Sequence, residues 1–139
     1  MSSATLVPPA AGPAPLRINS RKEVVRRFFE EVLTRKSETA IDELIAPDAM
    51  VSLPTGRFRG PQAVNRGIVQ LHTAFANLRV EVKIIIGEGD RIAAEWTMCG
   101  TERGELLGVP PSGRRTCLTG LSLSRVRRHR IVEHRMVGD

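Results

Sequence analysis

Apolar residues recur at helical spacing in the first half of the chain and predict three helices. The first begins at Ser20, which forms a capping box with Glu23, and its apolar side is Val24, Val25, Phe28, Phe29, Val32 and Leu33. The second covers residues 38–45 and ends before a proline. The third begins at Gly60-Pro61, because proline is tolerated at the first helical position, and its apolar side is Val64, Ile68, Leu71 and Phe75.

Beyond Asn77 the apolar pattern changes to the alternation of extended chain. A short strand over residues 50–53 precedes the third helix, and longer strands are predicted over residues 80–86, 91–99, 116–126 and 130–137. One face of the 91–99 strand carries Ile92, Ala94, Trp96 and Met98. Helices followed by a run of strands are typical of the α+β class. We therefore expect a cone-shaped α+β barrel, in which three N-terminal helices cover a curved antiparallel sheet around an apolar pocket.

Length and composition fit one domain preceded by a tail. The chain has 139 residues, of which 41% are hydrophobic and 26% charged, enough for a single core. Residues 1–19 hold four of the nine prolines and show no periodic apolar pattern. We therefore predict a disordered tail over residues 1–19, followed by one domain over residues 20–139.

The formal net charge of +6 raises the question of a nucleic-acid partner. The excess lies near the C-terminus, since residues 114–135 hold seven basic residues and one acidic residue. No aromatic residue is interleaved with these charges, as a base-stacking surface would require. The interpretation we prefer is a solvated basic hairpin, with no nucleic acid bound.

Cysteine usage and the absence of long apolar runs favour a cytoplasmic protein. Cys99 and Cys117 are far apart in the sequence and form no CxxC motif, so we expect buried free thiols rather than a disulfide. No apolar run reaches the roughly 18 residues of a membrane span, and the N-terminus lacks the pattern of a secretory signal. A membrane partner is therefore not expected.

His134 is the strongest candidate for chemistry. The sequence has no motif for nucleotide binding or metal-dependent hydrolysis and no cluster of ligands at metal spacing, so neither a metal nor a cofactor is predicted. In the last strand His134 shares a face with Val132 and Met136, which are apolar, and this face is therefore the inner one. A histidine with its usual pKa of about 6.5 suits general acid or base catalysis. A structural histidine bonded to the backbone is the alternative.

Other residues could line the same interior. His72 lies beside the apolar side of the third helix and either faces the pocket or is a structural histidine. Trp96 is either a platform for a flat aromatic ligand or core filling. Ser122 and Ser124 alternate with two leucines, so the sequence leaves open which of the two sets faces inward.

Several segments together resemble the SnoaL-like polyketide cyclase family, from about residue 20 to the end. They are VVRRFFEEVL, IDELIAPDAMV, the helix start GPQAV, GDRIAAEWTMCGTERGELLGVPPSGRR and RIVEHRMVGD. The most specific part is the block G-x-x-x-G-x-x-x-G-x-P-P-S-G-R from Gly100 to Arg114. The resemblance implies a nuclear transport factor 2-like fold with a deep apolar pocket. It also implies a role in bacterial secondary metabolism, often aromatic polyketide assembly, without metal or organic cofactor.

The resemblance departs from the aldol cyclases at the catalytic base. In those enzymes an aspartate two residues after the last-strand histidine removes a proton next to a carbonyl, and this chain has Met136 there. Ser122 matches a second inward histidine of the cyclases, and Val51 matches an asparagine. The chain is thus closer to a branch implicated in hydroxylating anthracycline-type polyketides, again without a bound cofactor.

The sequence therefore predicts a cofactor-free tailoring enzyme that hydroxylates a polycyclic substrate with O2. A cyclase that catalyses an intramolecular aldol condensation is one alternative, and a non-catalytic ligand-binding protein is another. The predicted catalytic residue is His134, and the predicted substrate-binding residues are Trp96, Met98, Ser122, Met136, His72 and Phe29. The expected partners are a hydrophobic aromatic polyketide, a separate short-chain reductase and a second copy of the chain.

Overall fold

Four helical segments form one layer of the molecule. The computed structural model describes residues 13–104 and 111–138. Helix α1 (Pro13–Arg27) continues directly into a π-helix, η3 (Phe28–Thr34), and α2 (Glu38–Leu44) and α3 (Gly60–Ala74) follow. The predicted helix start at Ser20 is wrong, because α1 already includes residues 13–19 of the predicted tail. Residues 1–12 of that tail lie outside the described residues.

A six-stranded mixed sheet forms the second layer. Its strands are β1 (Ile45–Leu53), β2 (Gly56–Arg59), β3 (Phe75–Glu88), β4 (Arg91–Glu102), β5 (Arg115–Arg127) and β6 (Arg130–Gly138). They lie in the order β2-β1-β6-β5-β4-β3. The sheet is curved but open, since β2 and β3 form its two edges.

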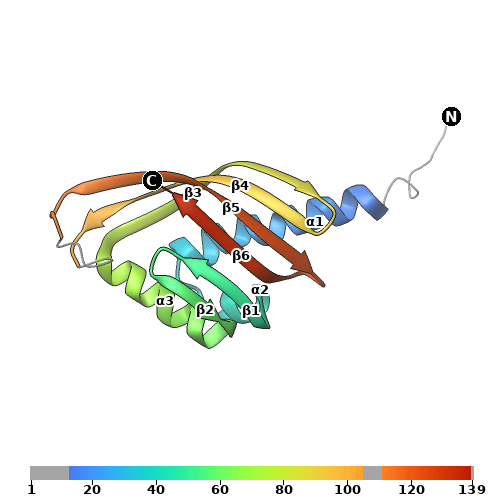
Figure 1. Cartoon of the computed structure of the whole chain (residues 1–139), viewed down its shortest axis with the longest axis horizontal. Helices are drawn as coiled ribbons and strands as arrows, with labels where there is room; N and C mark the ends of the chain where they lie inside the picture. Colours follow the sequence, from blue (N-terminus) through green and yellow to red (C-terminus); the bar gives the residue numbers. More distant parts are fainter. Residues whose placement is uncertain (1–12, 105–110, 139) are drawn as a thin grey trace.

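The α+β class is confirmed, but the prediction of a wholly antiparallel sheet is wrong. All neighbouring strands are antiparallel except β1 and β6, which are parallel. The cause is the connection through α3, which carries the chain from β2 to the far edge of the sheet. The hairpins from β3 to β6 then run back across the sheet, and β6 reaches β1 in the same direction (Figure 1).

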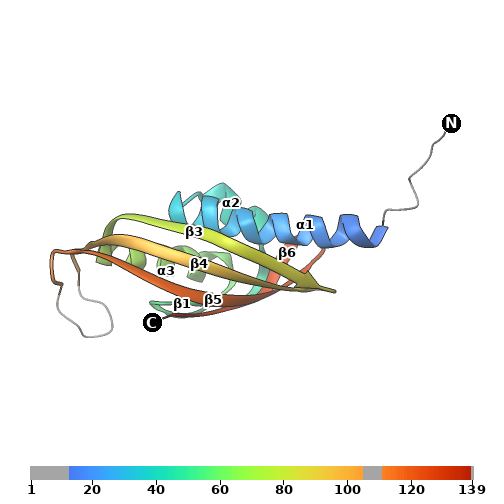
Figure 2. The same cartoon turned by 90° about the horizontal axis from the view of Figure 1, so that it is seen from above.

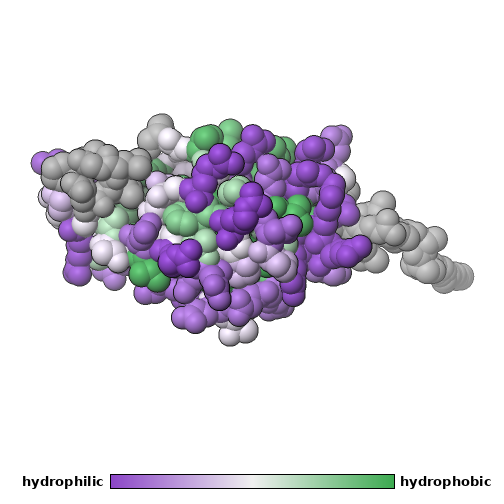
Figure 3. All heavy atoms as spheres, turned by 60° about the horizontal axis from the view of Figure 1, so that its bottom comes forward, coloured by the Kyte–Doolittle hydropathy of each residue, from purple (hydrophilic) through white to green (hydrophobic). Residues whose placement is uncertain are grey.

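The core lies between the helices and one face of the sheet. Figure 2 shows α1 and α2 on the same side of the sheet. The inward residues predicted for β4 are confirmed as buried, namely Ile92, Ala94, Trp96 and Met98. They face buried residues of the helical layer such as Phe28, Phe29 and Leu33. The side of the molecule in Figure 3 is mainly hydrophilic, with apolar residues in separate small patches.

The prediction of buried free thiols is wrong. Cys99 and Cys117 form a disulfide between β4 and β5, where the two residues lie directly opposite each other. Their separation of 18 residues suggested no contact, but the β4–β5 hairpin folds the chain back and brings them together. Cys117 is exposed and Cys99 only partly buried. Among the described residues, no helix has both the length and the apolar character to cross a membrane.

Candidate active site

The inner face of β5 carries serines, not leucines. Ser122 and Ser124 are 5% and 0% exposed, whereas Leu121 is 60% exposed on the other face. Ser124 lies opposite His134 of β6, and Ser122 lies opposite Ala94 of β4. The alternation that the sequence left open therefore places two hydroxyl groups in the core.

His134 is the buried centre of this region. Its side chain is 0% exposed, and its ring centroid lies 4.7 Å from that of Phe28 and 5.8 Å from that of Phe29. Burial lowers the pKa of His134 to about 3, because the charged imidazolium loses its hydration among these rings. The expectation of a histidine with its usual pKa is therefore wrong. At neutral pH His134 is an uncharged imidazole.

A hydrogen bond to Ser124 determines which ring nitrogen carries the proton. The Ser124 hydroxyl oxygen lies 2.7 Å from His134 Nδ1, while His134 Nε2 has no partner among the described residues. If the hydroxyl donates to Nδ1, only the Nε2–H donor stays unpaired. If Nδ1–H donates instead, both the hydroxyl proton and the Nε2 lone pair stay unpaired. Because each unpaired buried group costs about 1–3 kcal/mol, the first arrangement is favoured and His134 presents an N–H donor.

The Trp96 ring packs against Gly120 of β5 and Gly138 of β6 on the same inner face. A Cβ added at Gly138 would lie 2.7 Å from the Trp96 ring atom Cη2, and one at Gly120 would collide with the ring and with the carbonyl of Val137. These two glycines therefore make room for the indole. The side chain is 2% exposed, and its Nε1–H has no partner among the described residues.

Three unpaired polar atoms lie on one diagonal of the inner face. They are Trp96 Nε1, Ser122 Oγ and His134 Nε2, from three adjacent strands. On β5, Gly120 lies opposite Trp96 and Ser124 lies opposite His134. Ser122 is two residues from each of them, and its side chain is therefore a diagonal neighbour of both Trp96 and His134. Such diagonal neighbours are about 7–8 Å apart. Since buried polar groups are normally hydrogen-bonded, each of the three atoms marks a position where a polar ligand atom can bind.

Among the described residues, no carboxylate forms a hydrogen bond or an ion pair with His134. Its only hydrogen-bond partner among the described residues is Ser124. Met136 is partly buried on the inner face, directly opposite Ser122. Asp48 is exposed, and Asp139 lies outside the described residues.

The other predicted site residues divide into two groups. Phe29 and Met98 are buried in the same core as His134. His72 is half-buried, and its Nε2 lies 2.7 Å from the carbonyl oxygen of Leu33, which ties α3 to η3. Burial of the ring lowers its pKa. The structure therefore gives His72 a structural contact and does not place it with the diagonal.

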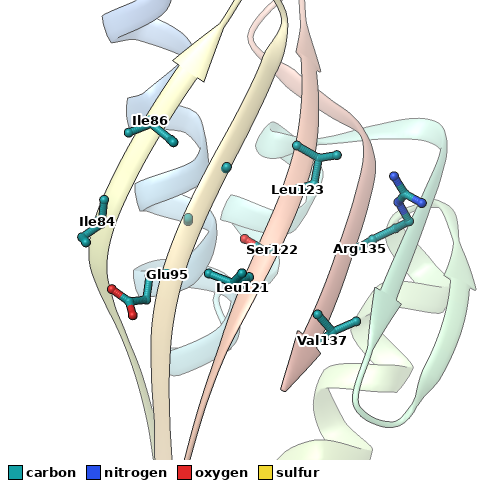
Figure 4. Close-up of a pocket in the computed structure, with 10 residues that line it drawn as sticks. Ile84, Ile86, Glu95, Leu121, Ser122, Leu123, Arg135 and Val137 are labelled. Carbon is teal, nitrogen blue, oxygen red and sulfur yellow. The ribbon is translucent and has the colours of Figure 1, made fainter. Parts of the chain in front are cut away.

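His134 lines none of the four cavities whose walls are described, although an apolar pocket around it was expected. Ser122 is among the residues that line a hollow on the outer face of the sheet (Figure 4). One cavity of about 580 Å³ lies between η3 and β3, and Phe29, Thr34, Val80 and Val82 are part of its wall. Phe29 thus contacts His134 and also forms part of the wall of this outer cavity. Within the described residues, no three His, Cys, Asp or Glu side chains are grouped to hold a metal ion.

Comparison with known proteins agrees with the resemblance in the sequence. The profile of the SnoaL-like polyketide cyclase family matches residues 23–139. No curated protein matches the chain. A SnoaL-like polyketide cyclase homologue from Jannaschia sp. CCS1 has a TM-score of 0.79 at 23% identity, covering 92% of this chain and 90% of that one, which shows the shared fold.

Two solved structures from Streptomyces are more similar in sequence. IdmH of Streptomyces antibioticus, described as a polyketide cyclase, is 29% identical with a TM-score of 0.72 and covers 86% of this chain and 91% of its own. AclR of Streptomyces galilaeus, described as a hydroxylase, is 26% identical with a TM-score of 0.71 and covers 88% of this chain and 76% of its own. Similar folds thus carry both kinds of description.

Proposed function

Because the chain belongs to the SnoaL-like polyketide cyclase family, we propose that it is a tailoring enzyme that hydroxylates a polycyclic aromatic polyketide with O2. Membership of this family, together with similar structures described as a cyclase and a hydroxylase, supports an enzyme. The observation that carries the finer proposal is the diagonal of unpaired donors beside a neutral His134, without a carboxylate base. The apolar side chains around His134 would suit a hydrophobic substrate of the anthracycline type, provided that the core opens to admit it.

The diagonal would hold more than one oxygen atom of the substrate, since Trp96 and His134 lie at its two ends and one atom cannot contact both. Neutral His134 donates from Nε2, Trp96 donates from Nε1, and the Ser122 hydroxyl adds a third group. A phenolate or enolate oxygen gains most from such donors, because its negative charge grows during the reaction in a site without water. The flat face of Trp96 suits a fused ring system.

The chemistry requires no group beyond the substrate, O2 and a source of two electrons. A reductase converts the quinone form of the substrate to the hydroquinone. The hydroquinone passes two electrons to O2, one oxygen atom replaces a ring hydrogen as hydroxyl, and the other leaves as water while the quinone is restored. The protein binds the ring, orients it and stabilises the phenolate that reacts with O2. A separate short-chain reductase is the partner that this scheme requires.

Cyclisation is the alternative, and the likeness to IdmH favours it. An aldol cyclase must remove a proton next to a carbonyl, which calls for a base of adequate strength. His134, with a pKa of about 3 caused by burial, is a weak base, and Met136 replaces the carboxylate. The described residues therefore suit stabilisation of an existing anion better than proton abstraction.

Access would pass through the cavity beside η3. Phe29 lines that cavity and also contacts His134, so movement of its side chain would expose His134 to the cavity. The cavity volume of about 580 Å³ is within the usual range for small-molecule sites. Phe29 belongs to a π-helix, an element that occurs frequently at functional sites.

The proposal predicts incorporation of one oxygen atom from O2. A tetracyclic anthraquinone is reduced with dithionite without air, mixed with the protein, and exposed to ¹⁸O₂. Mass spectrometry is expected to show a hydroxylated product with one ¹⁸O atom, formed faster than in a sample without protein. Dithionite replaces the reductase, so the test does not depend on that partner.

Two outcomes would contradict hydroxylation. A product from a linear polyketide thioester analogue that has lost water and contains no ¹⁸O would establish the cyclase instead. Binding of the anthraquinone without a hydroxylated product would contradict hydroxylation, and the additional absence of a product from the linear analogue would contradict both reactions. Binding itself is followed by quenching of Trp96 fluorescence, since Trp96 is the sole tryptophan of the chain.

A further inference from the structure

The side chain of Thr34, at the end of η3, is hydrogen-bonded to the edge of the sheet. The amide N–H of Val80 in β3 donates to the Thr34 hydroxyl oxygen at 2.9 Å. The hydroxyl itself can donate to the carbonyl oxygen of Val80 at 3.2 Å or to that of Phe29 at 3.1 Å. Because a hydroxyl has one proton, it serves one of these two carbonyls at a time. In both arrangements the Val80 amide joins β3 to η3.

Val80 offers its backbone groups to Thr34 because β3 is an edge strand. In the described sheet, β3 has β4 on one side and no strand on the other. Val80 lies opposite Met98 of β4, but its amide N–H donates to Thr34 and not to β4. Edge groups of this kind are normally covered in native proteins. The hydroxyl of Thr34 covers them here in place of a further strand.

The two elements that Thr34 joins are also the walls of the cavity beside η3. Phe29 and Thr34 contribute to one wall, and Val80 and Val82 contribute to the other. Val82 lies opposite Trp96 of β4 in the strand register, so the β3 wall adjoins the inner face that carries the diagonal. A wider opening into the core therefore requires η3 and β3 to separate.

A second side-chain bond holds the same end of η3 to a different neighbour. His72 of α3 donates from Nε2 to the carbonyl oxygen of Leu33 at 2.7 Å, one residue before Thr34. This bond does not involve β3. Loss of the Thr34 hydroxyl would therefore release η3 on its β3 side only, while His72 keeps it attached to α3.

We propose that Thr34 is a positioning residue that controls entry to the core. Its bond to Val80 holds η3 against β3, and its bond to the Phe29 carbonyl holds the backbone of the residue whose ring contacts His134. Without the hydroxyl, the last turn of η3 is freed and the Phe29 side chain can move. The inference rests on the proposed function only in that a substrate must reach His134; the opening itself is independent of the reaction.

T34V is the central variant, because it replaces the hydroxyl by a methyl group and keeps the branched shape. Acrylamide quenching of Trp96 fluorescence reports the opening, since Trp96 is the sole tryptophan and is 2% exposed. T34V is expected to raise the quenching rate constant at least about 3-fold through more frequent local opening. Hydrogen exchange of the Val80 amide is expected to accelerate at least about 10-fold, because that amide loses its acceptor.

Two further variants separate entry from general loosening. T34S keeps the hydroxyl and is expected to match the unaltered chain in both measurements. Thr73 gives the matched control, because its hydroxyl donates to the Val69 carbonyl at 2.9 Å within α3, away from the contact of η3 with β3. T73V removes this bond and is expected to leave Trp96 quenching and Val80 exchange unchanged.

Stopped-flow mixing with the anthraquinone links the opening to the proposed function. T34V is expected to raise the association and dissociation rate constants together, each about 10-fold, with little change in Kd. Trp96 quenching that is equal in T34V and the unaltered chain, or that rises equally in T34S or T73V, would overturn the inference. If T34V is quenched faster but the unaltered chain binds no anthraquinone, the proposed substrate is contradicted and the role of Thr34 in entry is supported.

Discussion

H134F is expected to lower kcat by about 10²–10³-fold with little change in KM. One hydrogen-bond donor aimed at a developing oxyanion contributes about this factor. Phenylalanine fits a space already walled by Phe28 and Phe29, so the chain should fold and bind the flat substrate. Steady-state rates with the reduced anthraquinone measure kcat, and Trp96 fluorescence measures binding independently.

Two further variants make the result specific to His134. H129F changes an exposed histidine in the β5–β6 turn and is expected to retain full activity. S124A removes the partner of Nδ1 but keeps the Nε2 atom, so a smaller loss of about 10-fold is expected. An unchanged kcat in H134F would show that the diagonal is not the reacting site.

G120A is expected to be the most destabilising of the single substitutions considered, by about 3 kcal/mol. The added Cβ would collide with the Trp96 ring and with the backbone carbonyl of Val137. Overpacking of this kind costs about 1–3 kcal/mol, and a rigid backbone neighbour places G120A at the upper end. Thermal unfolding should show a midpoint lowered by roughly 10 °C for a domain of this size.

Neighbouring positions supply the controls for G120A. At Gly138 the nearest atom is on the Trp96 ring, and the ring can shift, so G138A should cost less than G120A. T119A changes an exposed residue of the same strand and should cost less than about 1 kcal/mol. If G120A unfolds at the temperature of T119A, the indole does not lie over β5 as described.

The sequence predicted the parts of the fold that local periodicity controls. The buried face of β4 followed from strict alternation, and α3 began at the glycine-proline pair as expected. The parallel pairing of β1 with β6 could not be predicted, because it depends on where α3 carries the chain. The Cys99–Cys117 disulfide was missed for the same kind of reason, since it depends on strand register and not on spacing in the sequence.

Half of the site followed from the sequence, and half required the structure. Parity in the last strand correctly placed His134 inside. Ser124 was not selected, because leucine normally takes the buried position in an alternating strand. Here the leucines line the hollow on the outer face, which leaves the serines for the core. The alternation of Leu and Ser in a strand next to one with an inward histidine is the sequence pattern that could have identified Ser124 as a buried partner of His134.

The protonation state of His134 is the most direct test of its role as a hydrogen-bond donor to the substrate. A ¹⁵N NMR spectrum that correlates the ring nitrogens with the ring carbon-bound protons distinguishes the two neutral forms and the cation. From pH 5 to 8 we expect His134 to stay neutral with its proton on Nε2, because burial lowers its pKa to about 3 and Ser124 donates to Nδ1. A ring that titrates near pH 6.5, or a neutral ring with its proton on Nδ1, would contradict the assignment of His134 as a hydrogen-bond donor to the substrate.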